Sequence, residues 1–366
     1  MQALERARRL AAEQPAFDAH TDALQRALDL GHDLLTVTRG QFDLPRARQG
    51  GCGGAVLVCW VDPVFLPAGA ARRARDLIAA GHDLIQRSAG AIRLIRTAAD
   101  LAAARRQGSF AALLGIEGGH ALEERLERLE EFHGLGVRVL TLVWNNHLSW
   151  IRSCQPGAGP EIPGGLSDFG RQVVRRMDEL GMVIDLSHAG EQSFFDTLSA
   201  TRNPVIASHS GCRALHDHPR NLSDEQLRAL ARNGGVLGLV FHPGFLDAEA
   251  RAEEARVRES AAYRSLAHPN ETELFVLQGE LMQSVARPLP LSRLLDHIEH
   301  ALAVAGPEHV GLGSDFDGIL RGPRSAEDAK GYVQVAAGLL ERGHAEQVVR
   351  AVLGGNFERV LLRVLR

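Results

Sequence analysis

Acidic and histidine side chains follow five apolar runs of the sequence, where each run gives way to polar or glycine residues. Imidazole and carboxylate groups are the usual protein ligands of Zn²⁺, and such sites keep open positions for water and substrate. Gathered without cations in an enclosed space, these groups would lose hydration and the carboxylates would repel one another. The pattern therefore favours a metal site. Its members are His20, Asp22, Glu117, His188 and His209, with Asp315 following the last run.

The spacing indicates how these ligands divide between two cations. Side chains two residues apart on an extended segment point the same way, so His20 and Asp22 can share one ion. His188 and His209 follow neighbouring runs and can share a second ion. Glu117 has two oxygens and can bridge both. Taken singly, each feature more often serves a turn or a packed core, and it is their coincidence at matching positions that predicts the metal site.

Eight short apolar runs must position these groups. Most are apolar throughout, which is typical of strands buried on both faces of a parallel sheet. Helical patterns at residues 122–132, 166–180 and 223–233 lie between them, and Ser167 and Gly181 suit the two ends of the second. The runs are residues 16–19, 55–61, 111–116, 138–143, 182–186, 204–207, 235–240 and 310–313.

The alternation of strand and helix predicts an α/β fold, and eight strands make a (β/α)8 TIM barrel the preferred architecture. A doubly wound open sheet is the alternative, but no glycine-rich phosphate loop follows the first run. We expect one domain over residues 1–366. Residues 245–290, after the seventh run, form a long insertion in which residues 248–265 have a helical, exposed pattern.

The composition limits the partners and the cellular location that we expect. The chain of 366 residues is 45% hydrophobic and carries a net charge of −4, which gives no basic footprint for nucleic acid. Its four cysteines are scattered, no signal peptide is recognisable, and no apolar stretch approaches the roughly 18 residues of a membrane span. We expect a cytoplasmic protein without a membrane partner. The single lysine, Lys330, does not end an apolar run, which disfavours a carboxylated lysine as a metal bridge.

The motifs that contain these residues resemble those of the renal (membrane) dipeptidase family, peptidase family M19, in the amidohydrolase superfamily. The resemblance extends from residue 17 to the end of the chain and includes several long motifs. It implies a TIM barrel with two Zn²⁺ ions that cleaves the peptide bond of dipeptides, suggests acceptance of a C-terminal D-residue, and suggests a homodimer. The matching segments are Asp18-Ala19-His20-Thr21-Asp22 and residues 115–119, 165–188, 207–222, 311–318 and 354–360.

The resemblance also implies a role for each site residue. His20 and Asp22 would bind one zinc, His188 and His209 the other, and Glu117 would bridge the two. Two further residues would act on the dipeptide substrate: Arg220 would hold its free carboxylate, and Asp315 would carry protons during attack and amine departure.

One position departs from the family. Animal members have a histidine suited to polarising the scissile carbonyl just after the fourth strand, and this chain has Trp144 there. His147, Asn145 or Asn146 could supply the missing donor, and we expect His147 and Asn145 to bind substrate.

Two other functions stay open. A deacylase, lactonase or phosphotriesterase could use the same metal site, although Arg220 favours a substrate with a free carboxylate. A non-catalytic metal-binding scaffold would be expected to have lost a ligand or Asp315, and neither is lost. The ligands alone do not select Zn²⁺ over Mn²⁺, Fe²⁺ or Co²⁺.

Overall fold

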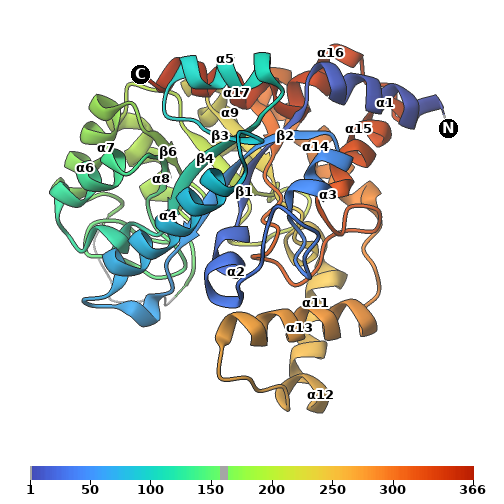
Figure 1. Ribbon diagram of the computed structural model, residues 1–366, viewed down its shortest axis with the longest axis horizontal. Helices are drawn as coiled ribbons and strands as arrows, with labels where there is room; N and C mark the ends of the chain where they lie inside the picture. Colours follow the sequence, from blue (N-terminus) through green and yellow to red (C-terminus); the bar gives the residue numbers. More distant parts are fainter. Residues whose placement is uncertain (1, 157–163) are drawn as a thin grey trace.

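The computed structural model describes residues 2–156 and 164–366, and its centre is a closed barrel of parallel strands wrapped by helices (Figure 1). The barrel order is β1, β2, β4, β5, β6, β7, β8, β9, and β9 pairs back to β1. This confirms the predicted TIM barrel, and each predicted apolar run contains a strand. The strands are β1 (Ala16–Thr21), β2 (Cys52–Trp60), β4 (Phe110–Glu117), β5 (Val137–Thr141), β6 (Val183–Asp185), β7 (Ile206–Ser210), β8 (Val236–Leu239) and β9 (Val310–Leu312).

The strands are buried on both faces, as their unbroken apolar sequences predict. Every residue of β1 and β4 is buried, because barrel side chains cover one face and helices the other. A further strand, β3 (Ile92–Leu94), pairs with the first residues of β4, and β5 takes over the same edge from Leu114 onward. The sequence analysis missed β3 because it is three residues long and Arg93 interrupts its apolar character.

Helices cover the outside of the barrel. Ser167 caps α7 by accepting a hydrogen bond from the Gly170 amide, and Gly181 ends the helix in the left-handed region, as predicted. Among the described residues, no helix combines the length and apolar composition needed to cross a bilayer. The helices are α1 (Gln2–Glu13), α2 (Ala23–Leu30), α3 (Leu44–Gln49), α4 (Ala70–Arg87), α5 (Ala98–Gln107), α6 (Leu126–Gly134), α7 (Asp168–Leu180), α8 (Glu191–Ala200), α9 (Asp224–Asn233), α14 (Leu291–Ala305), α15 (Tyr332–Glu341), α16 (Glu346–Arg350) and α17 (Asn356–Val364).

One predicted helix starts in the wrong place. The pattern at residues 122–132 predicted a helix from Leu122, but α6 begins at Leu126. Residues Gly119–Leu122 form a 3₁₀ turn, and Glu123 and Glu124 have φ values of 49° and 56°. A right-handed helix cannot pass through two residues in the left-handed region, so the amphipathic pattern extends further than the helix.

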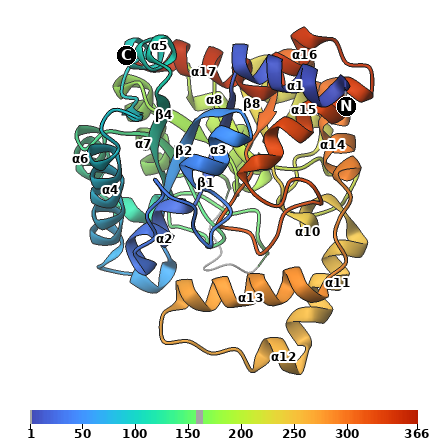
Figure 2. The ribbon, with the colours of Figure 1, turned by 45° about the vertical axis from the view of Figure 1, so that its right-hand side comes forward.

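The predicted insertion, residues 245–290, is largely helical. It includes α11 (Ala248–Glu259), α12 (Ala261–Arg264) and α13 (Glu271–Val285), preceded by the short α10 (Pro243–Leu246). In two views, α11 to α13 project from one end of the barrel, beside α2 (Figures 1 and 2). Thr272 of α13 donates to the Asp29 carboxylate of α2 at 2.7 Å, so α13 is fastened to the helix that follows β1. The insertion therefore reaches the rim formed by the carboxyl ends of the strands.

A buried carboxylate closes the barrel at that rim. Asp18 of β1 accepts hydrogen bonds from the amides of His20 at 3.1 Å and Ser314 at 2.8 Å, and its other oxygen accepts from the hydroxyls of Ser314 and Tyr332. Asp185 does the same between β6 and β7, where it accepts from the amides of Ser187 and Ser208. Asp18 thus fixes the loop after β9 against β1, and Asp185 fixes the loop after β6 against β7.

The chain has two tyrosines, which permits a matched test of this closure. Tyr332→Phe removes a buried donor from the Asp18 carboxylate and should lower the free energy of unfolding by about 1.5–3 kcal/mol. Tyr263→Phe removes only a 3.3 Å contact with the Arg258 guanidinium, so its effect should stay within about 0.5–1 kcal/mol. Urea denaturation of both variants, in the presence of a chelator, measures the difference. Equal losses of unfolding free energy in the two variants would show that the Tyr332–Asp18 hydrogen bond does not stabilise the barrel more than an ordinary tyrosine contact.

Candidate metal centre and active site

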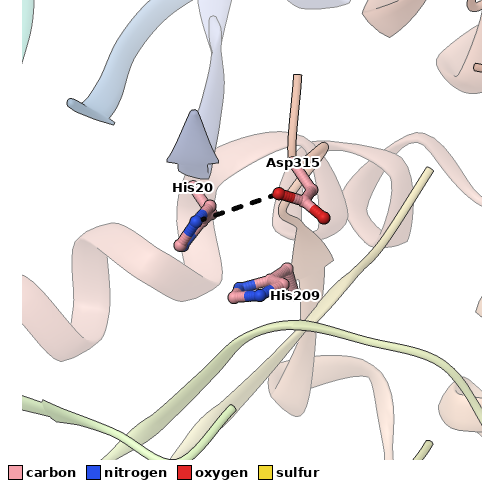
Figure 3. A group of neighbouring side chains, drawn as sticks. All are labelled: His20, His209 and Asp315. Carbon is pink, nitrogen blue, oxygen red and sulfur yellow. Dashed lines mark ion pairs between the residues drawn. The ribbon is translucent and has the colours of Figure 1, made fainter. Parts of the chain in front are cut away.

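The barrel brings all five predicted ligands, and Asp315, to one place. His20 lies in β1 with Asp22 just after it, Glu117 is the last residue of β4, and His209 lies in β7. His188 and Asp315 lie in the loops that follow β6 and β9. Figure 3 shows His20, His209 and Asp315 converging from three separate elements, with 3.9 Å between His20 Nε2 and Asp315 Oδ1.

Glu117 stands between the two predicted pairs. Its Oε2 lies 3.6 Å from His20 Nε2, which is also 3.6 Å from Asp22 Oδ2. Its Oε1 lies 2.9 Å from His188 Nε2 and 3.4 Å from His209 Nε2. Candidate ligand atoms therefore form two groups that share Glu117, and within each group all atoms lie within 4.8 Å of one another. The same criterion also groups His20 and His209 with Asp315.

Unpartnered polar atoms indicate that the cluster fits cations. Within the described ranges, His20 Nε2, Asp22 Oδ1 and Glu117 Oε1 are buried without a hydrogen-bond partner. Buried polar atoms are almost always hydrogen-bonded, because an unmet one costs free energy. The Nε2 atoms of His188 and His209 face each other at 3.0 Å. Coordination of divalent cations would satisfy all of these atoms, so the residues present fit the metals that the sequence predicts.

Hydrogen bonds at the other ring nitrogens orient the histidines. Ser208 Oγ lies 2.8 Å from His209 Nδ1 and 3.3 Å from His20 Nδ1, and it donates its single proton to Asp185 Oδ2 at 2.6 Å. Ser208 must therefore accept from the imidazoles, which places their protons on Nδ1. Asn145 Oδ1 accepts in the same way from His188 Nδ1 at 2.8 Å. All three histidines then offer the Nε2 lone pair, the form in which imidazole binds a metal.

Burial and crowding shift the pKa values of the clustered side chains. Burial, with help from the Arg220 guanidinium, lowers the pKa of His188 to about 4, and burial lowers the pKa of His209 well below its usual value. Burial also raises the pKa of Asp315 well above its usual value, and the Asp22 and Glu117 carboxylates add to this rise. The pKa of His20 moves the other way: burial opposes the rise, but the Glu117 and Asp22 carboxylates raise the pKa well above its usual value. Divalent cations would supply the positive charge that a proton on His20 otherwise offers to these carboxylates.

Two of these side chains depend on strained backbone. His188 has φ of 69° and Asp315 has φ of 63°, in the left-handed region that disfavours residues other than glycine. Each such residue costs of order 1–3 kcal/mol, which the surrounding structure must offset. The loops after β6 and β9 therefore turn sharply at the residue that carries the functional side chain.

A cavity of about 500 Å³ opens over the cluster. Its lining includes the aromatic side chains of Trp60, Trp144 and Phe245, residues Thr272, Leu274 and Phe275 of α13, and all of the cluster except His20. Its size suits a small molecule. Its lining carries both signs of charge, since the carboxylates of the cluster and the guanidinium of Arg220 both face it.

Arg220 is held with its charge toward this cavity. It is 3% exposed, donates from Nη2 to the His209 carbonyl at 3.1 Å, and lies with Cζ 5.5 Å from the centre of the Phe245 ring. Its Nε has no hydrogen-bond partner among the residues described. A buried guanidinium beside a cavity is suited to bind a carboxylate.

The two candidates near Trp144 are placed differently. Asn145 lines the cavity and holds His188. His147 is buried, and its Nδ1 accepts a hydrogen bond from the Ser153 amide at 3.0 Å. The structure thus brings Asn145 to the cluster, whereas His147 supports the following loop and is not part of the described cavity lining.

Sequence reasoning missed the residues that orient the ligands. Asp185 and Ser208 are buried behind the histidines, and neither was singled out. Their positions carried a signal, since Asp185 lies three residues before His188 and Ser208 directly precedes His209. Polar residues at buried strand ends need partners, so they could have been predicted to support the ligands.

Comparisons with known proteins agree with this geometry. A family model described as membrane dipeptidase (peptidase family M19) matches residues 4–365. Dipeptidase 3 of Rattus norvegicus is 32% identical, covering 98% of this chain and 67% of its own length. An uncharacterized dipeptidase of Schizosaccharomyces pombe is 31% identical, covering 94% of this chain and 79% of that protein.

Solved structures share the fold over nearly the whole chain. A metallo peptidase of family M19 described as dipeptidase AC has a TM-score of 0.79 at 26% identity, covering 96% of this chain and 98% of that one. A metallo peptidase from Rhodobacter sphaeroides, liganded with a phosphinate mimic of the dipeptide L-Ala-D-Ala, has a TM-score of 0.79 at 25% identity, covering 96% and 99%.

The orienting role of Ser208 can be tested by metal affinity. Ser208→Ala removes the acceptor that fixes Nδ1–H of His20 and His209, so the affinity for divalent cations should fall by about 10–100-fold. Competition with a chromogenic chelator measures this affinity. Ser199→Ala, on the exposed surface of α8, is the control and should bind metal as the parent does. Unchanged affinity in Ser208→Ala would contradict the proposed hydrogen-bond direction.

Proposed function

Because the chain belongs to the membrane dipeptidase family, peptidase family M19, and is therefore a metallo-dipeptidase, we propose that it hydrolyses dipeptides at a centre of two divalent cations. The observation that carries the proposal is the pair of ligand groups that share Glu117. His20 and Asp22 would hold one cation, His188 and His209 the other, and Glu117 would bridge them. Zn²⁺ is the cation we propose, because mixed imidazole and carboxylate ligands suit it.

Bound cations supply Lewis acidity and lower the pKa of a water molecule. The chain must then bind the dipeptide, orient its peptide carbonyl and move protons. Arg220 lines the cavity and binds the dipeptide, because its guanidinium can pair with the C-terminal carboxylate. The Rhodobacter relative was solved with a mimic of L-Ala-D-Ala, which supports our proposal that a C-terminal D-residue is accepted here as well.

Asp315 is the proposed proton carrier. It lines the cavity beside the cluster, and its side chain is 13% exposed, more than those of His20, Asp22 and Glu117. A carboxylate in this position can accept a proton from the attacking water at Oδ and deliver it to the nitrogen of the leaving amine. Both transfers need the carboxylate on the cavity side, and Asp315 is among the residues that line the cavity.

Asn145 is the proposed donor to the substrate carbonyl. Trp144 occupies the position of the family histidine, and its ring lies 5.1 Å from that of Trp60 as part of the cavity wall. Asn145 Oδ1 is engaged by His188, which leaves the two N–H groups of its amide for substrate. We place this role on Asn145 rather than His147 because Asn145 lines the cavity. A cytoplasmic location and a homodimer stay predictions.

Metal removal tests the function itself. Dialysis against a chelator should abolish hydrolysis of L-Ala-L-Ala and L-Ala-D-Ala, and about two equivalents of Zn²⁺ should restore it. Metal analysis of the purified protein and an amine-release assay measure both quantities. N-acyl amino acids and lactones, assayed in parallel, are the alternative substrates. Faster turnover of either than of any dipeptide would contradict the dipeptidase proposal.

Arg220 and Asp315 should affect different kinetic constants. Arg220→Ala removes a contact that the carboxylate keeps from ground state to transition state, so KM should rise about 100-fold with little change in kcat. Asp315→Asn keeps the shape but cannot carry a proton, so kcat should fall by about 10²–10⁴. Steady-state kinetics on L-Ala-L-Ala separate the two. The assignments are wrong if Arg220→Ala leaves KM unchanged or Asp315→Asn retains full kcat.

A further inference from the structure

Three aromatic rings are stacked beside Arg220 where β8 leads into the insertion. The Phe245 ring lies 4.3 Å from that of His242, with an interplanar angle of 1°, and 4.3 Å from that of His218, at 29°. Two rings cannot occupy the same face of a third at this distance, so Phe245 is packed between them. All three residues line the cavity, yet neither histidine belongs to the metal ligands.

Backbone hydrogen bonds fix the form of both imidazoles. His242 Nδ1 accepts from the Gly244 amide at 3.0 Å, and His218 Nδ1 accepts from the Arg220 amide at 3.2 Å. A nitrogen that accepts cannot carry the proton, so in each neutral ring the proton is on Nε2. This is the reverse of His20, His188 and His209, whose protons lie on Nδ1. The two sets of histidines therefore offer opposite groups to the cavity: lone pairs from the ligands and N–H donors from this pair.

The surroundings keep these rings uncharged. Burial lowers the pKa of His218 to about 3, with Arg251 and Arg220 adding to the effect. Burial also lowers the pKa of His242, although the Glu254 carboxylate, 3.9 Å from Nδ1, opposes the shift. A neutral donor can sit beside the Arg220 guanidinium and near the cations without the repulsion that an imidazolium would meet.

Position singles out His242 of the two. It lies in the loop that follows β8, and β8 pairs with β7, the strand that carries His209. Its ring packs against Phe245, and the Arg220 Cζ lies 5.5 Å from the centre of the same Phe245 ring. His242 and Arg220 are thus held through one aromatic ring at one side of the cavity, and the side chain of His242 is 18% exposed.

We infer that His242 is a specificity-determining residue that donates its Nε2–H to the C-terminal carboxylate of the dipeptide beside Arg220. The inference rests on the proposed binding of that carboxylate by Arg220 and deepens it. A carboxylate offers only acceptors, so it can take donors from both residues. A dipeptide amide would set its own NH₂ donor against His242 or Arg220, which leaves a buried donor unmet. The pair therefore selects substrates with a free carboxylate.

Two substitutions separate the donor from the ring. His242→Phe keeps a flat ring against Phe245 but removes the N–H, so KM for L-Ala-L-Ala should rise about 10–100-fold while kcat changes less than about threefold. His242→Gln restores a side-chain N–H donor and should recover most of the lost affinity. His268→Gln, on the exposed surface of the insertion, is the matched control and should match the parent.

The carboxylate dependence gives a readout that a structural role would not move. With L-Ala-L-Ala amide as substrate, His242→Phe should equal or exceed the parent enzyme in kcat/KM, because it removes the donor that opposes the amide NH₂. The preference for the free dipeptide over the amide should therefore shrink by at least about 10-fold. Metal content and the urea midpoint of each variant are measured alongside. A variant whose lower activity is matched by metal loss, or falls equally on dipeptide and amide, overturns the inference.

Failure of the inference can be told from failure of the proposed function. If the parent enzyme hydrolyses no dipeptide, the proposed function is wrong. If the parent is active and Arg220→Ala raises KM, but His242→Phe leaves KM unchanged, carboxylate binding stands and the role of His242 is overturned.

Discussion

The cost of enclosing three carboxylates and three imidazoles at one end of a barrel governs this structure. Burial strips water from Asp22, Glu117 and Asp315, and Glu117 lies within 4 Å of three histidine Nε2 atoms. Bound cations would offset the cost of this cluster, and the scaffold must in addition prevent the ligands from moving apart. The closed sheet, the strained loops and the buried hydrogen bonds behind the ligands all serve that second requirement.

Two strand-end aspartates show how the scaffold does this. Asp18 and Asp185 each accept the amide two residues ahead and an amide from a neighbouring strand. Neither faces the cavity as a ligand. Each fixes the backbone next to a site residue: Asp18 holds His20 and the loop that carries Asp315, and Asp185 holds the loop that carries His188. The same hydrogen bonds that tie neighbouring strands together therefore also position the metal site. Asp185 has a second effect: it accepts the hydroxyl proton of Ser208, so Ser208 must accept from His209 and the proton of His209 lies on Nδ1.

The sequence predicted the barrel and the convergence of the ligands because both follow from local pattern: unbroken apolar runs and polar groups at their ends. It could not predict features set by tertiary contacts. Amphipathicity continued through Glu123 and Glu124, where the backbone does not stay helical. Asn145 and His147 are equivalent in the sequence, and only the fold places one at the cavity. The contribution of α13 to the cavity wall depends on its attachment to α2, which no pattern in the insertion reveals.

Two kinds of polar group line the cavity. The lining combines candidate metal ligands and Asp315 with the Arg220 guanidinium and the imidazoles of His218 and His242. Phe245 connects the second group, since its ring packs against both histidines and its centre lies 5.5 Å from the Arg220 Cζ. The two neutral imidazoles add N–H donors beside Arg220 without adding positive charge. In the proposed function, the ligand cluster acts on the peptide bond and Arg220 binds the free carboxylate, so a substrate must carry both groups within one cavity of about 500 Å³. A dipeptide meets both requirements, because its free carboxylate belongs to the residue that cleavage of its only peptide bond releases.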